Sequence, residues 1–154
     1  MARLKRKDIT IVVDSREQRP FLMEALGFKV KVGTLKTGDY SVAGLEDLVT
    51  VERKSLSDLI SCIGTSRGRF EKELKRMEAF KSKCVVVSAL ESEIFKGGWH
   101  YSKILPKQVV GSYTGWMTWG IPFIFARDHE AAAARAAHFL MLFANHHIEK
   151  IKCL

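Results

Sequence analysis

The sequence predicts an α/β domain with three layers, in which helices cover both faces of a central mixed β-sheet. Three observations support this fold class. Strand-like apolar segments lie close together in the first third of the chain, and strand-like and helical segments alternate in the rest. The 154 residues, of which 47% are apolar and 27% charged, suit a globular protein with one core. We therefore expect a single domain spanning residues 1–154.

The predicted strands are short and mostly apolar. Residues 9–13 are β-branched and are followed by Asp14, which is typical of a buried strand. Residues 28–32 alternate apolar and charged side chains, as expected for a strand with one exposed face. Residues 83–89 are apolar enough to be buried on both faces, which favours a parallel neighbour. The other strand-like segments are 38–40 (a turn or the start of a strand), 48–54 and 121–125.

Apolar residues recur at three- and four-residue intervals in four segments, which predicts amphipathic helices. Ser55 and Asp128 are candidate N-caps for two of them, and Pro106 suits the first turn of a third. Apolar residues of the last helix, such as Leu140 and Phe143, suit the core and a dimer interface equally well. The predicted helices are 55–63, 67–81, 106–119 and 128–147.

Basic residues outnumber acidic ones by 25 to 17, which gives a formal net charge of +8. They concentrate in residues 3–7 and 67–83. Because phosphate neutralisation releases counterions, this excess favours a polyanionic partner, although a solvated helix face explains many of the charges in 67–83 equally well. Arg67 and Arg69 are our candidates for contacts with the backbone phosphates of such a partner.

Cysteine usage and hydropathy exclude several protein classes. The three cysteines are widely spaced, which argues against a disulfide framework or a zinc ribbon. Cys62 and Cys84 lie in apolar runs and are expected in the core. The nearly unbroken apolar stretch 139–144 is far shorter than the ~20 residues of a membrane helix, and the N-terminus lacks the pattern of a signal peptide. We expect a soluble intracellular protein, cytoplasmic in a prokaryote or phage and nuclear in a eukaryote.

The residues that could carry chemistry centre on the strand 48–54. Because side chains alternate along a strand, Glu52 and Lys54 project to one side, and Val51 and Arg53 to the other. A carboxylate can hold a divalent cation while a neighbouring lysine positions the attacking water. Twelve residues separate Asp39 from Glu52, enough for the chain to reverse and bring the two carboxylates together. Oxygen ligands of this kind suit Mg2+ or Mn2+.

These residues form a known pattern. Gly38-Asp39, twelve residues, Glu52-Arg53-Lys54, three residues and then Asp58 resembles the GD…ERKxxxD signature of the xeroderma pigmentosum group F (XPF) nucleases. The segment Val13-Asp-Ser-Arg-Glu17 resembles the VDxRE motif of the same family. That family is a branch of the PD-(D/E)XK superfamily, so the resemblance implies a restriction-endonuclease-like fold.

The resemblance also implies roles for individual residues. Asp39 and Glu52 would bind Mg2+ or Mn2+, helped by the backbone carbonyl of Val51. Asp14 would lie at the same site as a further ligand, directly or through water. Lys54 would orient or activate the attacking water.

The other motif residues would support this site. Arg53 would brace acidic neighbours, including Asp58. Arg16 and Glu17 belong to the VDxRE motif, and Arg16 could contact the scissile phosphate. The implied reaction is metal-dependent hydrolysis of DNA phosphodiesters at branched, flap or fork structures or at duplex–single-strand junctions, as in DNA repair and recombination.

Simpler interpretations exist for single residues. Ser55-x-x-Asp58 before an apolar helix is a capping-box pattern, and Gly38-Asp39 is a common turn dipeptide. Glu52 and Lys54 alone would suit a solvated strand face with a salt bridge. Together with Asp14 these residues favour the nuclease interpretation. The alternative function is a catalytically silent nuclease-like module that binds DNA or supports an active partner; such relatives usually lose the acidic residues or the lysine.

Many relatives carry a helix-hairpin-helix domain and often a helicase, whereas nothing follows Leu154 here. We therefore expect a stand-alone or partner-dependent catalytic module. Relatives commonly dimerise through the catalytic domain, so a homodimer or heterodimer is expected.

Overall fold

A six-stranded mixed sheet forms the centre of the computed structural model, which describes residues 3–153. The strand order is β2-β1-β3-β4-β5-β6. Strands β1 and β2 are parallel, β3 is antiparallel to both β1 and β4, and β4, β5 and β6 are parallel. The strands are β1 (Thr10–Asp14), β2 (Lys29–Gly33), β3 (Tyr40–Val42), β4 (Val49–Lys54), β5 (Ser82–Val87) and β6 (Phe123–Phe125).

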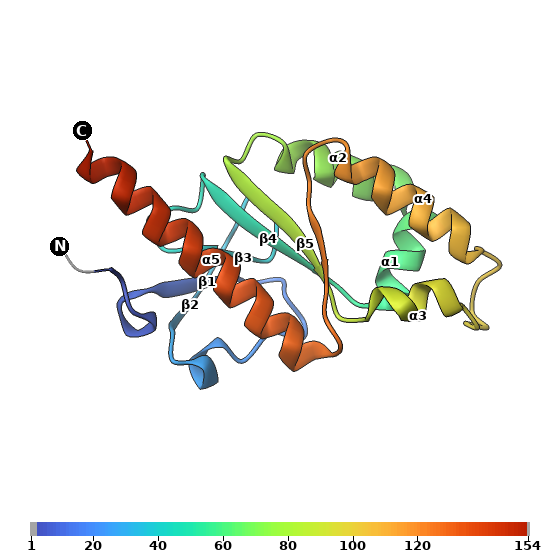
Figure 1. Ribbon diagram of the computed structural model, residues 1–154, viewed down its shortest axis with the longest axis horizontal. Helices are drawn as coiled ribbons and strands as arrows, with labels where there is room; N and C mark the ends of the chain where they lie inside the picture. The colour runs from blue at the N-terminus through green and yellow to red at the C-terminus, as the bar shows by residue number, and fades with distance from the viewer. Residues whose placement is uncertain (1–2, 154) are drawn as a thin grey trace.

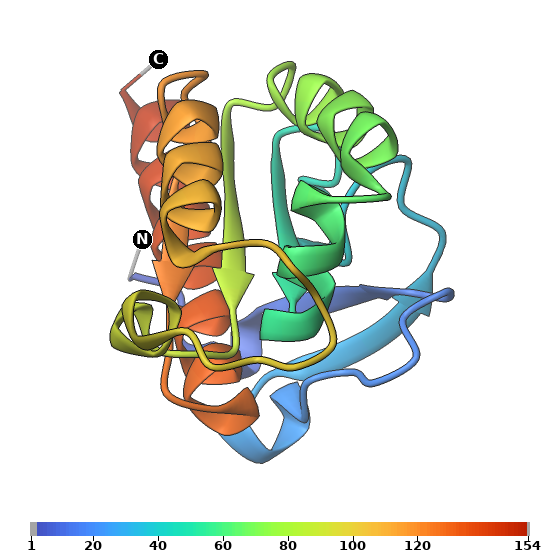
Figure 2. The same ribbon diagram turned by 90° about the vertical axis from the view of Figure 1, so that its right-hand side faces the viewer.

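Helices cover both faces of this sheet (Figures 1 and 2). The long helix α5 crosses one face, and α1, α2 and α4 pack on the other. The helices are α1 (Leu56–Ile63), α2 (Arg67–Met77), α3 (Glu91–Lys96), α4 (Pro106–Met117) and α5 (His129–Lys152), with short 3-10 helices η1 (Arg6–Asp8) and η2 (Met23–Leu26). The predicted three-layer α/β/α fold with a mixed sheet is therefore confirmed.

Strand β5 separates two hydrophobic cores. Cys84 and Val86 pack in the core beneath α5, whereas Val85 and Val87 pack beneath α1, α2 and α4. All four side chains are buried, as predicted for a strand covered on both faces. The same alternation in β4 sends Val51 toward α5. Its neighbours Glu52 and Lys54 consequently face the α1–α2 layer.

The helices differ from the sequence predictions in four places. Helix α4 ends at Met117 instead of residue 119. Helix α2 ends at Met77 instead of residue 81, because the chain tightens into a turn before β5 begins at Ser82. Helix α5 continues to Lys152 instead of residue 147. Helix α3 was not predicted, since its six residues are too few to display helical periodicity. The strand predicted at 121–125 corresponds to β6, which is shorter and covers only Phe123–Phe125.

The remaining predictions about the core can also be compared with the structure. Cys62 and Cys84 are buried, as expected, and the three cysteines carry free thiols. In α5, Leu140 and Phe143 lie in the core, whereas Leu142 is 43% exposed. Within residues 3–153 no helix is both long and apolar enough to cross a membrane.

Candidate active site

A cavity of about 260 Å3 lies where the ends of β1 and β4 approach α2. At ~30 Å3 for each water molecule, this volume can hold a phosphate group, a cation and a few waters. Acidic side chains and Lys54 lie inside it, and basic side chains surround it. Its charged lining residues are Asp14, Asp39, Lys54, Glu73, Arg16, Lys36, Arg69 and Arg76.

The turn at Gly38 places Asp39 between two strands. The Asp39 amide donates to the Val51 carbonyl at 2.9 Å, and its carbonyl accepts from the Asp14 amide at 2.8 Å. Gly38 has φ +85°, and a Cβ there would clash with the Thr50 hydroxyl. Only glycine fits this position. The Val51 carbonyl already accepts from the Asp39 amide, and its role as a metal ligand stays a prediction.

Glu52 and Lys54 project from β4 on the same side, as the strand alternation predicts. Glu52 Oε1 lies 3.5 Å from Lys54 Nζ, and the Glu52 side chain is only 7% exposed. The Lys54 amine also lies 4.9 Å from the centroid of the Phe70 ring. Glu52 Oε2 is buried and has no hydrogen-bond partner among the described residues. An unpartnered buried carboxylate oxygen is costly unless it meets a proton or a cation.

The electrostatics of the cavity reflect this crowding of carboxylates. Burial, together with the charges of Glu17 and Glu73, raises the pKa of Asp39 to about 6, although the Arg53 amide opposes the shift. Burial and the charges of Asp39 and Glu73 also raise the pKa of Glu52. Burial alone would lower the pKa of Lys54, but the Glu52 carboxylate raises it overall, so the amine stays protonated.

These features fit a hard divalent cation. Asp39 and Glu52 supply carboxylate oxygens, one of which is buried and unpartnered, and oxygen donors are what Mg2+ and Mn2+ prefer. No preformed group of three or more His, Cys, Asp or Glu side chains with metal-binding spacing is found in residues 3–153. Mg2+ usually binds through one or two carboxylates and keeps several waters, so two close carboxylates suffice.

Asp14 lies in the same cavity, but its two oxygens already accept hydrogen bonds. Arg16 Nε and the Leu35 amide donate to them at 2.8 and 2.9 Å. Burial opposes ionisation, but these donors lower the pKa of Asp14 overall. Its role as a metal ligand stays a prediction. The Arg16 side chain is 68% exposed at the cavity rim.

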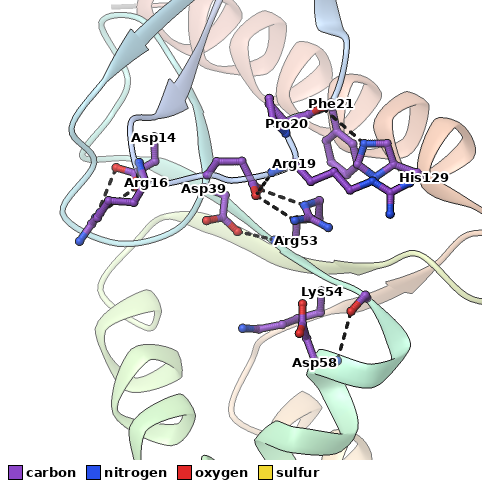
Figure 3. Close-up of polar contacts among 12 residues, drawn as sticks. Asp14, Arg16, Arg19, Pro20, Phe21, Asp39, Arg53, Lys54, Asp58 and His129 are labelled. Atoms are coloured by element: carbon purple, nitrogen blue, oxygen red, sulfur yellow. Dashed lines mark hydrogen bonds and ion pairs between the residues drawn. The ribbon is translucent and has the colours of Figure 1, made fainter.

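Arg53 joins the two sequence motifs from the opposite side of β4 (Figure 3). Its guanidinium donates to Glu17 at 2.8 and 3.0 Å, and its amide donates to Asp39 Oδ2 at 2.8 Å. The prediction that Arg53 braces Asp58 is wrong. Strand alternation directs Arg53 away from the helix layer, whereas Asp58 lies exposed on α1, where Ser55 Oγ accepts from its amide at 3.1 Å.

The two predicted phosphate-binding arginines occupy different positions. Arg67 donates to Glu71 and Ser112 at 2.7 and 2.9 Å and lies over the Trp116 ring, so it connects α2 to α4. Arg69 instead lines the cavity.

Sequence reasoning missed further residues that line the cavity, namely Lys36, Glu73 and Arg76. Glu73 follows Arg69 by four residues and Arg76 follows Glu73 by three, so all three lie on the same face of α2. This spacing in the sequence could have indicated that Glu73 and Arg76 lie on the same side of α2 as Arg69.

A mixed sheet between helices, with acidic side chains and a lysine gathered at the end of β4, is the arrangement of a nuclease-type α/β domain. The chain belongs to the ERCC4 domain family, whose model matches residues 13–139. This range includes every predicted site residue, and it confirms the family indicated by the motifs.

Two solved structures of XPF from Aeropyrum pernix are similar in fold. The first is 20% identical in sequence and has a TM-score of 0.72. The match covers 93% of this chain and 69% of the Aeropyrum pernix chain. The second, a complex with DNA, is 21% identical in sequence and has a TM-score of 0.70. The match covers 88% of this chain and 64% of the Aeropyrum pernix chain. The chain thus spans about two thirds of the length of these proteins. Comparison with curated proteins found no match.

Proposed function

We propose that this protein is a divalent-metal-dependent endonuclease that hydrolyses DNA phosphodiesters at branched or junction structures. The observation that carries the proposal is the buried Glu52 carboxylate, 3.5 Å from the Lys54 amine and in the field of Asp39. Membership of the ERCC4 domain family makes a nuclease the expected activity for such a site.

Each side chain has a definite task in this reaction. Asp39 and Glu52 would hold Mg2+ or Mn2+, which supplies Lewis-acid stabilisation of the charge that develops on the phosphate. Lys54, held protonated by Glu52, orients the attacking water and stabilises negative charge as a donor. The bond between the Arg53 amide and Asp39 fixes one carboxylate in place.

Basic residues at the cavity rim would bind the DNA backbone. Arg16, in the turn after β1, and Arg69, on α2, both line the cavity. Phosphate contacts of this kind position the duplex without reading its sequence. Selection of branches, flaps and forks would then depend on DNA shape. Such structures arise in DNA repair and recombination, and a dimer would add a second DNA contact.

Cleavage assays test this proposal. The purified chain, stripped of metal with EDTA, is given Mg2+ or Mn2+ and labelled flap, fork, splayed and Holliday substrates. We expect cleavage that needs the metal, and loss of at least about 100-fold in rate for Glu52→Gln and for Lys54→Ala. Lys81→Ala and Glu78→Gln remove the same charges from exposed positions outside the cavity and serve as controls.

Three results would contradict the endonuclease assignment. Cleavage that persists in EDTA would remove the metal from the mechanism. Cleavage that survives both Glu52→Gln and Lys54→Ala would place the chemistry elsewhere. Tight DNA binding without any cleavage would instead assign the chain to the class of catalytically silent, DNA-binding nuclease-like modules.

A further inference from the structure

Helix α2 brings one more carboxylate to the cavity. Glu73 lies outside both sequence motifs, 21 residues beyond Glu52 in the chain. Its helix is anchored by Phe70, Leu74 and Met77, which are buried in the core beneath the sheet. Glu73 is half-buried and lines the cavity together with Asp39 and Lys54.

The Glu73 carboxyl group lies next to Glu52. The two side chains are close enough to share a hydrogen bond when one of them is protonated, and Glu73 also acts on Asp39 and Lys54 through its charge. Glu52 is 5% exposed, and its Oε2 atom has no partner among the described residues. A buried, unpartnered oxygen beside a second carboxylate marks a place for a cation.

The other acidic residues nearby are already neutralised by arginines. Asp14 pairs with Arg16 at 2.8 Å, and Glu71, two residues before Glu73, pairs with Arg67 at 2.7 Å. Within residues 3–153, the ion pairs of the structure do not include Glu73 or Asp39. The charge of Lys54 therefore acts on three carboxylates but forms an ion pair only with Glu52, so Asp39 and Glu73 are left without one.

We propose that Glu73 is a third carboxylate of the metal site, binding the divalent cation directly or through a water molecule. This inference rests on the proposed metal-dependent function and extends it. A helical glutamate would close the site from the side opposite β4. It would also couple the position of α2, with Arg69 and Arg76, to the metal that faces the DNA.

Binding of Mn2+ to the full chain without DNA tests the role of Glu73. Isothermal titration calorimetry compares the wild type with Glu73→Gln, Glu52→Gln and Glu78→Gln. We expect Glu73→Gln to weaken Mn2+ binding by about 10- to 100-fold. Glu78→Gln removes the same charge from the exposed end of α2, outside the cavity, and should bind Mn2+ like the wild type.

The outcomes separate this inference from the proposed function. If Glu52→Gln abolishes Mn2+ binding while Glu73→Gln binds like the wild type, the role of Glu73 is overturned and the metal site at Glu52 stands. If the wild type binds no Mn2+, both are overturned.

A second variant guards against misfolding. Glu73→Asp keeps the carboxylate on a shorter side chain, and we expect it to bind Mn2+ more tightly than Glu73→Gln. Equal weakening by both variants, with unchanged circular dichroism and thermal unfolding in EDTA, would overturn a ligand role that depends on charge.

Discussion

Arg53 and Glu17 form an ion pair 2.8 Å long that joins the two sequence motifs beneath the cavity. Their side chains are 12% and 5% exposed, and Glu17 also accepts from the Tyr40 hydroxyl at 3.2 Å. The backbone amide of the same arginine holds Asp39. The pair therefore fixes the position of a proposed metal ligand without touching the cavity itself.

Removal of one partner from this pair should be costly. Glu17→Gln leaves the Arg53 guanidinium poorly compensated in a buried place, and we expect a loss of about 3 kcal/mol in the free energy of unfolding. Urea denaturation at pH 7 measures it. Glu46→Gln, at a position away from both motifs, is the charge-matched control, and equal small losses in both variants would show that the pair contributes little.

The same pair predicts a dependence of stability on pH. Burial opposes ionisation, but the hydrogen bonds from Arg53 lower the pKa of Glu17 below its ordinary value of 4.5. A carboxyl group with a lowered pKa stabilises the fold above that value and loses its contribution as pH falls. The difference in unfolding free energy between the wild type and Glu17→Gln should therefore shrink below about pH 4.5. A difference that stays constant down to pH 3 would contradict this.

Gly38 should be irreplaceable for steric reasons. It has φ +85°, and an added Cβ would strike the Thr50 side chain. We expect Gly38→Ala to cost at least about 2 kcal/mol of unfolding free energy and to displace Asp39.

Gly44→Ala is the matched control for this substitution. Gly44 has φ +89°, but an added Cβ there would meet no atom within 4 Å, so alanine should cost only the backbone penalty of about 1–2 kcal/mol. Equal losses in the two variants, measured by urea denaturation, would show that the contact with Thr50 has no effect.

The metal-free protein should be stabilised by removal of a carboxylate. Burial and the charges of Glu17 and Glu73 raise the pKa of Asp39 to about 6. A raised carboxyl pKa means that the fold loses stability as pH rises from the ordinary value of 3.8 to about 6. In EDTA at pH 7.5, Asp39→Asn should therefore be more stable than the wild type by about 1–3 kcal/mol.

Thermal unfolding in EDTA across pH checks this prediction. The advantage of Asp39→Asn should vanish near pH 4, and Mn2+ should stabilise the wild type only. Asp47→Asn, at an exposed position, should change neither curve. A variant less stable than the wild type at pH 7.5 would mean that the bond from the Arg53 amide outweighs the crowding of charges.

Much of the site followed from local sequence rules. Alternation along β4 correctly placed Glu52 and Lys54 on one side, and the spacing to Asp39 correctly predicted a chain reversal. The partner of Arg53 could not be predicted in this way. Glu17 lies 36 residues before Arg53 in the chain. The two residues meet because the sheet order places β1 and β4 on the two sides of the short strand β3. Glu73 was missed because its helix has a basic composition typical of a solvated face.

The basic residues of α2 should differ in what they contribute. Arg69 lines the cavity, so Arg69→Ala should weaken DNA binding about equally on all sequences and lower the salt dependence by about one released counterion. Fluorescence anisotropy at several salt concentrations measures both effects. Lys31→Ala, on the exposed edge strand β2, is the control for the loss of one positive charge.

Arg67 should instead contribute to stability. Its hydrogen bonds to Glu71 and Ser112 and its position over Trp116 join α2 to α4, so Arg67→Ala should lower the free energy of unfolding by about 1 kcal/mol. Its DNA affinity and salt dependence should match those of the wild type, because its guanidinium is already engaged within the protein. If Arg67→Ala lowers the salt dependence and Arg69→Ala does not, DNA crosses α2 on the side facing α4, away from the cavity.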